Sequence, residues 1–197
     1  MSYNPQQPDP KRLEELLKQQ PQITKEIQQT IEHINQKIEK IKDERSKETI
    51  KKYWQPVIDS LITLNKHIQT MTTHITQLPR IGAENLWQDI WNTGLSITQT
   101  AVDIYYHIKY ILPEIAYILQ SQEIKEFIVQ TYILLKQLYT LTVCPWTASI
   151  VAEFSQVPQH PLHKRLMMTA ETYIKNTWLF LEKEEKAPPP RTETVTS

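Results

Sequence analysis

Histidines are the residues in this sequence with the widest chemical range, and their spacing does not fit metal binding or acid–base catalysis. They stand at positions 33, 67, 74, 107, 160 and 163. No two lie four apart on one expected helix beside a carboxylate, the arrangement a zinc hydrolase needs. His67 and His74 are seven apart, and His160 and His163 are three apart, but neither pair has a third ligand nearby. We therefore expect no metal site and no cofactor.

The remaining residue types that could carry chemistry are few. Cys144 is the single cysteine, and because no catalytic His or Asn pattern surrounds it, we interpret it as a core residue. Gly82 and Gly94 are isolated and cannot form a phosphate-binding loop. The Glu-x-x-His motifs of di-iron bundles are also missing. The sequence predicts that the protein is not an enzyme.

Charge and hydropathy exclude further classes. Lys+Arg and Asp+Glu are both 22, so net charge gives no general attraction to nucleic acid or anionic membrane. The N-terminus lacks the apolar stretch of a signal peptide. Of the two most apolar windows, residues 101–119 contain Asp103, Lys109 and Glu114, and residues 127–144 are short and contain Lys136. We expect neither to span a membrane.

The elements that must position these residues are predicted to be helices. Only two of 197 residues are glycine, so tight hairpin turns have little raw material, and prolines divide the chain into helix-length pieces. The expected helices cover residues 9–20, 21–52, 53–78, 86–112, 113–120, 123–143, 146–154 and 163–186. The predicted fold is all-α, a helical bundle with a long N-terminal helical arm. The arm comprises residues 1–52, the bundle residues 53–186, and an extended Pro-rich tail residues 187–197.

The predicted arm carries a narrow apolar seam. It consists of isoleucines spaced alternately four and three residues apart, Ile27, Ile31, Ile34, Ile38 and Ile41. Beyond them Arg45 and Glu48 occupy the next positions of the seam. A long helix with so little to bury is marginal alone, so we expect the seam to pack against a partner.

Basic side chains decorate the same arm and suggest a second kind of partner. They are Lys11, Arg12, Lys18, Lys25, Lys37, Lys40, Lys42, Arg45, Lys47, Lys51 and Lys52. Three interpretations of the arm remain open: a coiled coil with other helices, a helix lying on a membrane, and a helix lying along nucleic acid with these residues reaching phosphates. The membrane interpretation is the weakest, because the seam lacks Trp, Phe and Leu. Simple Glu/Lys pairing on a solvated helix also explains many of the charges.

The bundle segment is rich in aromatic residues. They include Trp87, Trp91, Tyr105, Tyr106, Tyr110, Tyr117, Tyr132, Tyr139, Trp146 and Trp178. A bundle of this size readily buries about half of them. We expect the others to line subunit contacts or a lipid-facing surface.

A polar, lysine-bearing arm that leads through the aromatic and proline junction "KKYWQPVI" into an apolar bundle resembles the major coat proteins of filamentous archaeal viruses with linear double-stranded DNA. Usage rich in Ile, Gln, Thr, Tyr and Lys and poor in Gly also resembles proteins of viruses from hot acidic springs. The resemblance implies a virion coat subunit, assembled in the host cytoplasm into a helical filament. Its N-terminal helices would wrap double-stranded DNA held in A form, without sequence specificity.

The same resemblance implies partners besides DNA. They are further copies of the chain or a related second coat protein with which it forms a heterodimer, and in enveloped members a lipid layer. The alternative is a coiled-coil scaffold or adaptor subunit of a cellular assembly. Purification separates the two, because a coat protein is recovered in DNA-containing filaments and an adaptor as a discrete oligomer without DNA.

Overall fold

Every regular element in the computed structural model, which describes residues 7–156 and 161–183, is helical. In chain order the elements are α1 (Pro10–Glu39), α2 (Glu44–Thr76), α3 (Leu78–Ile81), α4 (Ala83–Tyr106), η1 (His107–Ile111), α5 (Leu112–Leu119), α6 (Gln122–Leu138), η2 (Tyr139–Val143), α7 (Cys144–Ser155) and α8 (Pro161–Lys183). This confirms the predicted all-α fold. The predicted tail, residues 187–197, lies outside the described residues.

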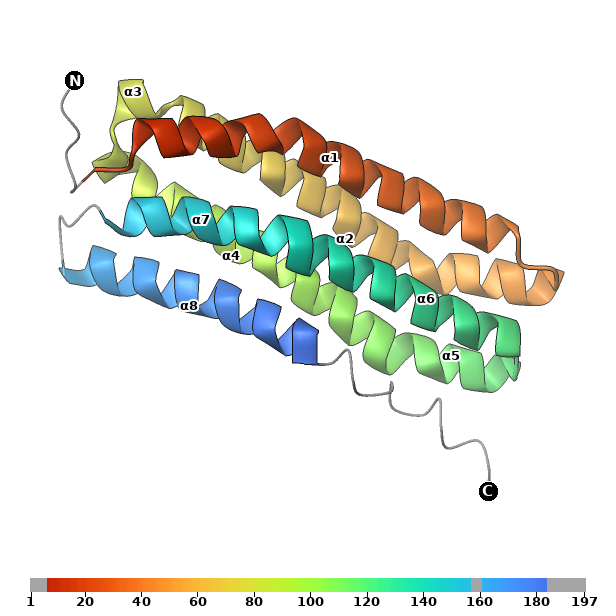
Figure 1. Ribbon diagram of the computed structural model, residues 1–197. Coiled ribbons are helices and arrows are strands. Elements are labelled where there is room, and N and C mark those ends of the chain that lie inside the picture. The colour runs from red at the N-terminus through yellow and green to blue at the C-terminus, as the bar shows by residue number, and fades with distance from the viewer. Residues whose placement is uncertain (1–6, 157–160, 184–197) are drawn as a thin grey trace.

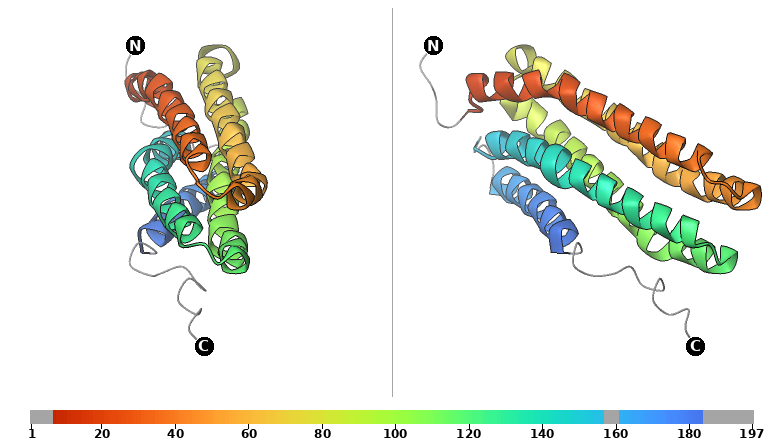
Figure 2. Two further views of the ribbon diagram at one scale, coloured as in Figure 1. Left: turned by 90° about the vertical axis from the view of Figure 1, so that its right-hand side faces the viewer. Right: turned by 45° about the vertical axis from the view of Figure 1, so that its right-hand side comes forward.

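The helices form an elongated four-cornered bundle with a fifth helix outside it (Figure 1). One corner is α1, the next α2, the third the continuous α4–η1–α5, and the fourth the continuous α6–η2–α7. The end-on view in Figure 2 shows these four corners, and α8 lies on the outside. Helix α1 packs against α2, α6 and α7, while α8 packs against α4, α7 and η2. The corner α4–η1–α5 is therefore diagonal to α1.

Helix α1 is one rod of 30 residues, although we expected a break at Pro21. It begins at Pro10, behind Asp9, whose side chain accepts a hydrogen bond from the Lys11 amide. Pro21 lies inside the helix on its exposed side. Proline supplies no N–H there, so the carbonyl four residues earlier loses its helical partner, and on an exposed side water can replace it.

The first chain reversal falls at residues 40–43, inside the segment that we expected to be one helix. The Lys40 amide closes α1 by bonding to the Gln36 carbonyl at 3.2 Å. Asp43 then caps α2, because its carboxylate accepts a hydrogen bond from the Ser46 amide at 3.0 Å. The failure of the isoleucine seam after Ile41 marks this turn.

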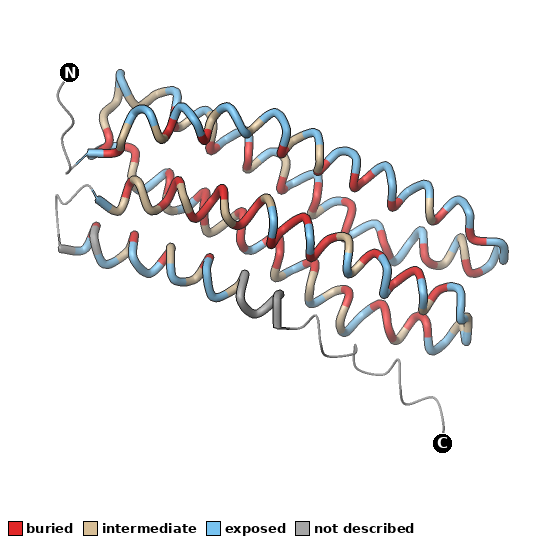
Figure 3. Tube along the Cα trace, in the orientation of Figure 1, coloured by how far each residue is buried: buried red, intermediate tan, exposed pale blue. Residues whose placement is uncertain are grey.

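The structure therefore differs from the expectation of a protruding arm. The expected boundary between residues 52 and 53 lies inside α2, and Trp54 just after it is fully buried with its ring 5.0 Å from that of Phe127. Residues from α1 and from the start of α2 belong to the same core cluster as those of α4 to α8. Figure 3 shows this core as a buried strip along the inward side of the rods. The physical reason is the turn at 40–43, which folds α1 back along α2.

Two prolines that we expected to end helices are instead accommodated within them. Pro113 and Pro145 are the second residues of α5 and α7, and the π-helical segments η1 and η2 precede them directly. A proline ring collides with the carbonyl four residues before it and supplies no N–H, and a wider turn relieves both problems. Each rod therefore continues past its proline. Because a π-helical turn contains one more residue than an α-helical turn, it shifts which of the following side chains face outward.

Candidate interaction surfaces

The side chains considered for catalysis do not converge in the structure. The described residues contain no group of three or more His, Cys, Asp or Glu that could hold a metal ion. His163 is fully buried, with its ring 4.4 Å from that of Trp87, and His160 lies outside the described residues. Cys144 is buried, as predicted, and burial raises the pKa of its thiol to about 12. This thiol is protonated and unreactive at neutral pH.

The isoleucine seam faces the chain's own core. Ile27, Ile31, Ile34, Ile38 and Ile41 are all buried. They form an apolar face, as predicted, but α2, α6 and α7 of the same molecule cover it. These isoleucines are not an exposed seam for a second molecule.

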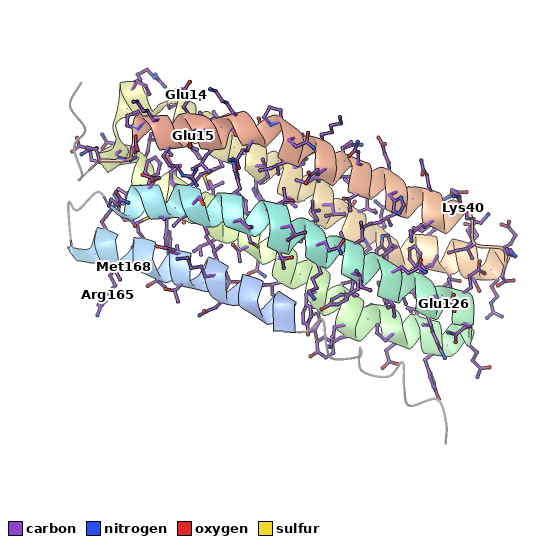
Figure 4. The ribbon with its side chains drawn as sticks, viewed as in Figure 1. Glu14, Glu15, Lys40, Glu126, Arg165 and Met168 are labelled. Carbon is purple, nitrogen blue, oxygen red and sulfur yellow. The ribbon has the colours of Figure 1, made fainter. Side chains whose placement is uncertain are left out.

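The basic residues of segment 1–52 lie in two groups at opposite ends of α1. Lys11, Arg12 and Lys18 are near its start, beside Glu14 and Glu15, whereas Lys40 is at the far end (Figure 4). The turn at 40–43 gathers seven of them around this far end, which we call the hairpin end: Lys37, Lys40, Lys42, Arg45, Lys47, Lys51 and Lys52. Lys25 lies between the two groups. A single ligand site does not contain all eleven residues.

Several of these cations are already paired. Arg12 contacts Glu15 at 3.4 Å, Lys18 contacts Glu14 at 3.7 Å, and Lys47 contacts Glu44 at 3.4 Å. Exposed pairs of this kind contribute little to stability, so they could be released without large cost.

The pairing at the hairpin end also involves other helices. Lys51 donates to Glu39 at 2.9 Å, which joins the two arms of the turn and lowers the pKa of that carboxyl. Lys37 donates to Gln130 of α6 at 2.9 Å. Lys52 stands 5.7 Å from the centre of its neighbouring ring, that of Tyr53.

Four of the basic residues are exposed and, within the described parts of the chain, their side chains make no hydrogen bond or ion pair. These are Lys25, Lys40, Lys42 and Arg45.

The edge between α1 and the rod α6–η2–α7 is hollowed, and we call this hollow the α1 groove. One part, of about 570 Å³, lies between Glu26, Gln29 and His33 of α1 and Leu134, Leu138 and Leu141 on the other side. A second part, of about 330 Å³, continues toward Arg12 and shares Leu141 with the first. The groove has polar rims and apolar leucines in its wall.

Polar contacts hold this edge together. The Trp146 indole N–H donates to the Leu16 carbonyl at 2.7 Å, and the Thr142 hydroxyl donates to Glu26 at 3.0 Å. The Asp9 amide donates to Glu153 at 3.1 Å. These bonds fix the groove's width at one end and at its middle.

Leu141 stands at the centre of the α1 groove and is 75% exposed, more than any other large apolar side chain of the described residues. It lies within η2, whose neighbours Thr140 and Val143 are buried. Leu141 was not predicted from the sequence, because the spacing of apolar residues in a regular α-helix does not reveal a π-helical turn. The signal was available in Pro145 four residues later.

A second apolar surface runs from the last residue of α4 along η1 and α5, on the corner diagonal to α1. We call it the aromatic ridge, and it consists of Tyr106, Tyr110, Tyr117 and Ile118, which are between 48% and 69% exposed. The rings of Tyr106 and Tyr110 are 5.0 Å apart.

Other aromatic residues behave differently from those of the ridge. Tyr139 and Trp146 are buried, and Trp87, Trp91, Tyr105 and Tyr132 are partly buried against the core. The side chain of Trp178 lies outside the described residues. The expectation that some rings are left over from the core is met at the ridge.

Comparison with known proteins gives no relative: no family model, no curated protein and no solved structure matches this chain. By length and composition, one continuous helix of the described residues, Gln122–Ser155, could cross a membrane. However, 56% of its most apolar window is buried inside the bundle. Core helices of bundles commonly have this property, so it is weak evidence for a span.

Proposed function

We propose that this protein is a structural subunit that assembles with further copies of itself, and that it is a virion coat protein that packages double-stranded DNA in a helical filament. The observation that carries the assembly is the 75% exposure of Leu141 in the middle of the α1 groove. A leucine held away from the core by η2 gains free energy when another surface covers it, about 1.5 to 3 kcal/mol on full burial.

The groove supports a contact between unlike surfaces of neighbouring copies. The groove lies on one edge of a bundle without internal symmetry. The surface of the neighbouring copy that fills the groove must therefore come from a different face of that copy. Contacts between unlike faces generate either closed rings or open helical filaments, depending on the rotation between neighbours. Pairing with a related second coat protein would use the same geometry, and an envelope would lie outside the tube.

DNA packaging is the finer part of the proposal, and the hairpin end supports it best. Lys40, Lys42 and Arg45 project from a turn between two helices, where repeated subunits could present them together to phosphates. Glu39, Asp43, Glu44 and Glu48 stand among them, so we expect one subunit alone to have little attraction for DNA. Binding would therefore depend on assembly.

The experiment for assembly is sedimentation velocity over a range of protein concentrations. We expect the parent chain to form large species and Leu141→Gln to shift their onset to at least tenfold higher concentration. The control is Ile62→Gln, because Ile62 is also exposed but lies on the outer side of α2, and it should behave as the parent. Equal assembly by the parent and Leu141→Gln would remove the basis of the proposal.

The experiment for DNA adds linear double-stranded DNA at several salt concentrations. The triple variant Lys40→Gln, Lys42→Gln, Arg45→Gln should bind more weakly, and its salt dependence should flatten by about 0.9 in log–log slope per lost phosphate contact. A matched triple variant, with Lys66, Arg80 and Lys175 each replaced by Gln, should keep the parent slope. Discrete oligomers that ignore DNA would favour the scaffold or adaptor alternative.

A further inference from the structure

The aromatic ridge lies where the bundle lacks a fifth helix. Helix α8 packs on α4, α7 and η2, and it ends before α5 begins (Figure 1). Beyond its end, the exposed side chains of Tyr110, Tyr117 and Ile118 continue along the outer face of the bundle. Large apolar side chains gathered in this way mark an interaction site more often than a solvated surface.

The chemistry of the ridge specifies one kind of ligand. Tyrosine presents a flat apolar ring and a hydroxyl that donates a hydrogen bond, and Tyr106 and Tyr110 hold two such rings 5.0 Å apart. Rows of aromatic rings bind proline-rich segments, because a polyproline II helix offers apolar proline rings to the aromatic faces. Its carbonyls have no internal hydrogen bonds and can accept from the hydroxyls.

The chain carries such a segment directly after α8. Residues 187–191 read Ala-Pro-Pro-Pro-Arg, and they follow Lys183, the last residue of α8, by a few positions. Consecutive prolines favour the polyproline II conformation, which lowers the cost of ordering such a segment on binding. We propose that Pro188, Pro189 and Pro190 bind the aromatic ridge of their own molecule.

The distances allow this contact. Helix α8 runs in the same direction as α4, and the Tyr173 hydroxyl donates to Gln99. Counting about 1.5 Å per residue from that pair, the end of α8 is roughly 15 Å along the bundle and Tyr117 roughly 27 Å, so about 12 Å separates them axially. At about 3.1 Å per residue, the segment reaches roughly 16 Å from Lys183 at Pro188 and 22 Å at Pro190. The prolines can therefore lie along Tyr110 and Tyr117.

The tether to α8 also favours the chain's own proline segment over a proline segment of a separate molecule. Contacts between a short proline segment and aromatic rings are weak by themselves, but a short linker gives an effective concentration in the millimolar range. Binding within one molecule is independent of protein concentration, whereas binding between copies is not. The proposal uses the ridge and not the α1 groove, so it stands apart from the assembly proposal.

The test is nitration of the full-length protein by tetranitromethane, with each tyrosine followed by mass spectrometry. Tyr173 of α8 serves as the internal reference. We expect Tyr110 and Tyr117 to react at least threefold faster, relative to Tyr173, when the three prolines are replaced by serine. The matched control replaces Thr192, Thr194 and Thr196 of the same segment by alanine and should leave the parent rates unchanged.

A reciprocal measurement follows the segment itself. Trypsin cleavage after Lys186 and Arg191 should be at least threefold faster in Tyr110→Ser, Tyr117→Ser than in the parent. The proposal would be overturned if the proline variant were nitrated at the parent rate and the tyrosine variant were cleaved at the parent rate. Protection that grows with protein concentration would overturn binding within one molecule in favour of a second copy. Protection that requires added phospholipid vesicles would overturn it in favour of a membrane surface.

Discussion

Substituting Ile34 by alanine tests whether α1 belongs to the core or behaves as a separate arm. Ile34 is fully buried in the last two turns of α1. The substitution removes three carbon atoms, which at about 0.8 kcal/mol each cost about 2.4 kcal/mol in transfer free energy. The space left behind adds to this cost where neighbours cannot move in. Because the α1 groove next to His33 gives those neighbours room to move, we expect the total loss to stay near 2.5 kcal/mol.

The assay is unfolding by urea, followed by helical circular dichroism. The midpoint should fall while the slope stays unchanged, since the same surface is exposed on unfolding. Ile34→Val should lose only about 0.5 to 1.5 kcal/mol. The control Ile62→Ala removes the same atoms from a side chain that is 43% exposed, and it should lose at most about 0.5 kcal/mol. If Ile34→Ala costs no more than Ile62→Ala, α1 does not contribute to the core.

Three further outcomes follow from buried positions. Gly94→Ala should destabilise the protein by about 1 kcal/mol, although alanine has the better helix propensity. The reason is that the new Cβ would lie 2.9 Å from Cγ2 of Val151, a stiff β-branched neighbour. Thermal unfolding should show that this loss of stability vanishes in a Val151→Ala background. Burial lowers the pKa of His163 from its ordinary value of 6.5, so the folded state binds this proton less readily than the unfolded state, and stability should be complete above pH 6.5 and fall as the pH drops below it. Urea midpoints measured across that range should show a smaller fall for His163→Gln, and equal falls would assign the effect to other groups. Cys144 should react with a thiol reagent at pH 8 only as fast as the protein unfolds, and rapid labelling of the native chain would contradict its burial.

The sequence was sufficient for fold class because its signals were local. Scarce glycine, helix-length spacing between prolines and the isoleucine spacing of α1 all depend on residues within one or two helical turns. The isoleucines between positions 27 and 41 were predicted correctly as an apolar face, whereas Leu13, Leu16 and Ile23, which extend the buried face of α1 toward its start, were not. The start of the first expected helix, at residue 9, also agrees with the observed start of α1 at Pro10.

The errors came from features that depend on the rest of the molecule. Pro21, Pro113 and Pro145 all suggested helix ends, but the first lies on an exposed side and the other two follow π-helical turns. The true reversal at 40–43 has neither glycine nor proline, and its signals are the end of the isoleucine seam at Ile41 and Asp43 three residues before Ser46. What covers the isoleucines of α1 could not be predicted, because α6 and α7 lie about a hundred residues away in the chain.

The same was true of the candidate surfaces. The basic residues were identified as a set, yet the turn at 40–43 alone decides which of them meet at the hairpin end. Tyr106 and Tyr110 are four residues apart, which places them on one helical face, but only the length of α8 leaves that face uncovered. Leu141 was indistinguishable from a core leucine by pattern.

The position of α1 also has a consequence for synthesis on the ribosome. Helix α1 is made first, but the Leu16 carbonyl receives its hydrogen bond from Trp146, 130 residues later in the chain. At the usual pace of translation this interval lasts on the order of 10 s. During it, the α1–α2 hairpin has emerged with one apolar flank uncovered, since α6 and α7 do not yet exist. The nascent chain therefore passes through an intermediate whose exposed apolar surface makes it prone to aggregation. A chaperone that binds this flank during synthesis would improve the yield of folded protein more than one acting after release.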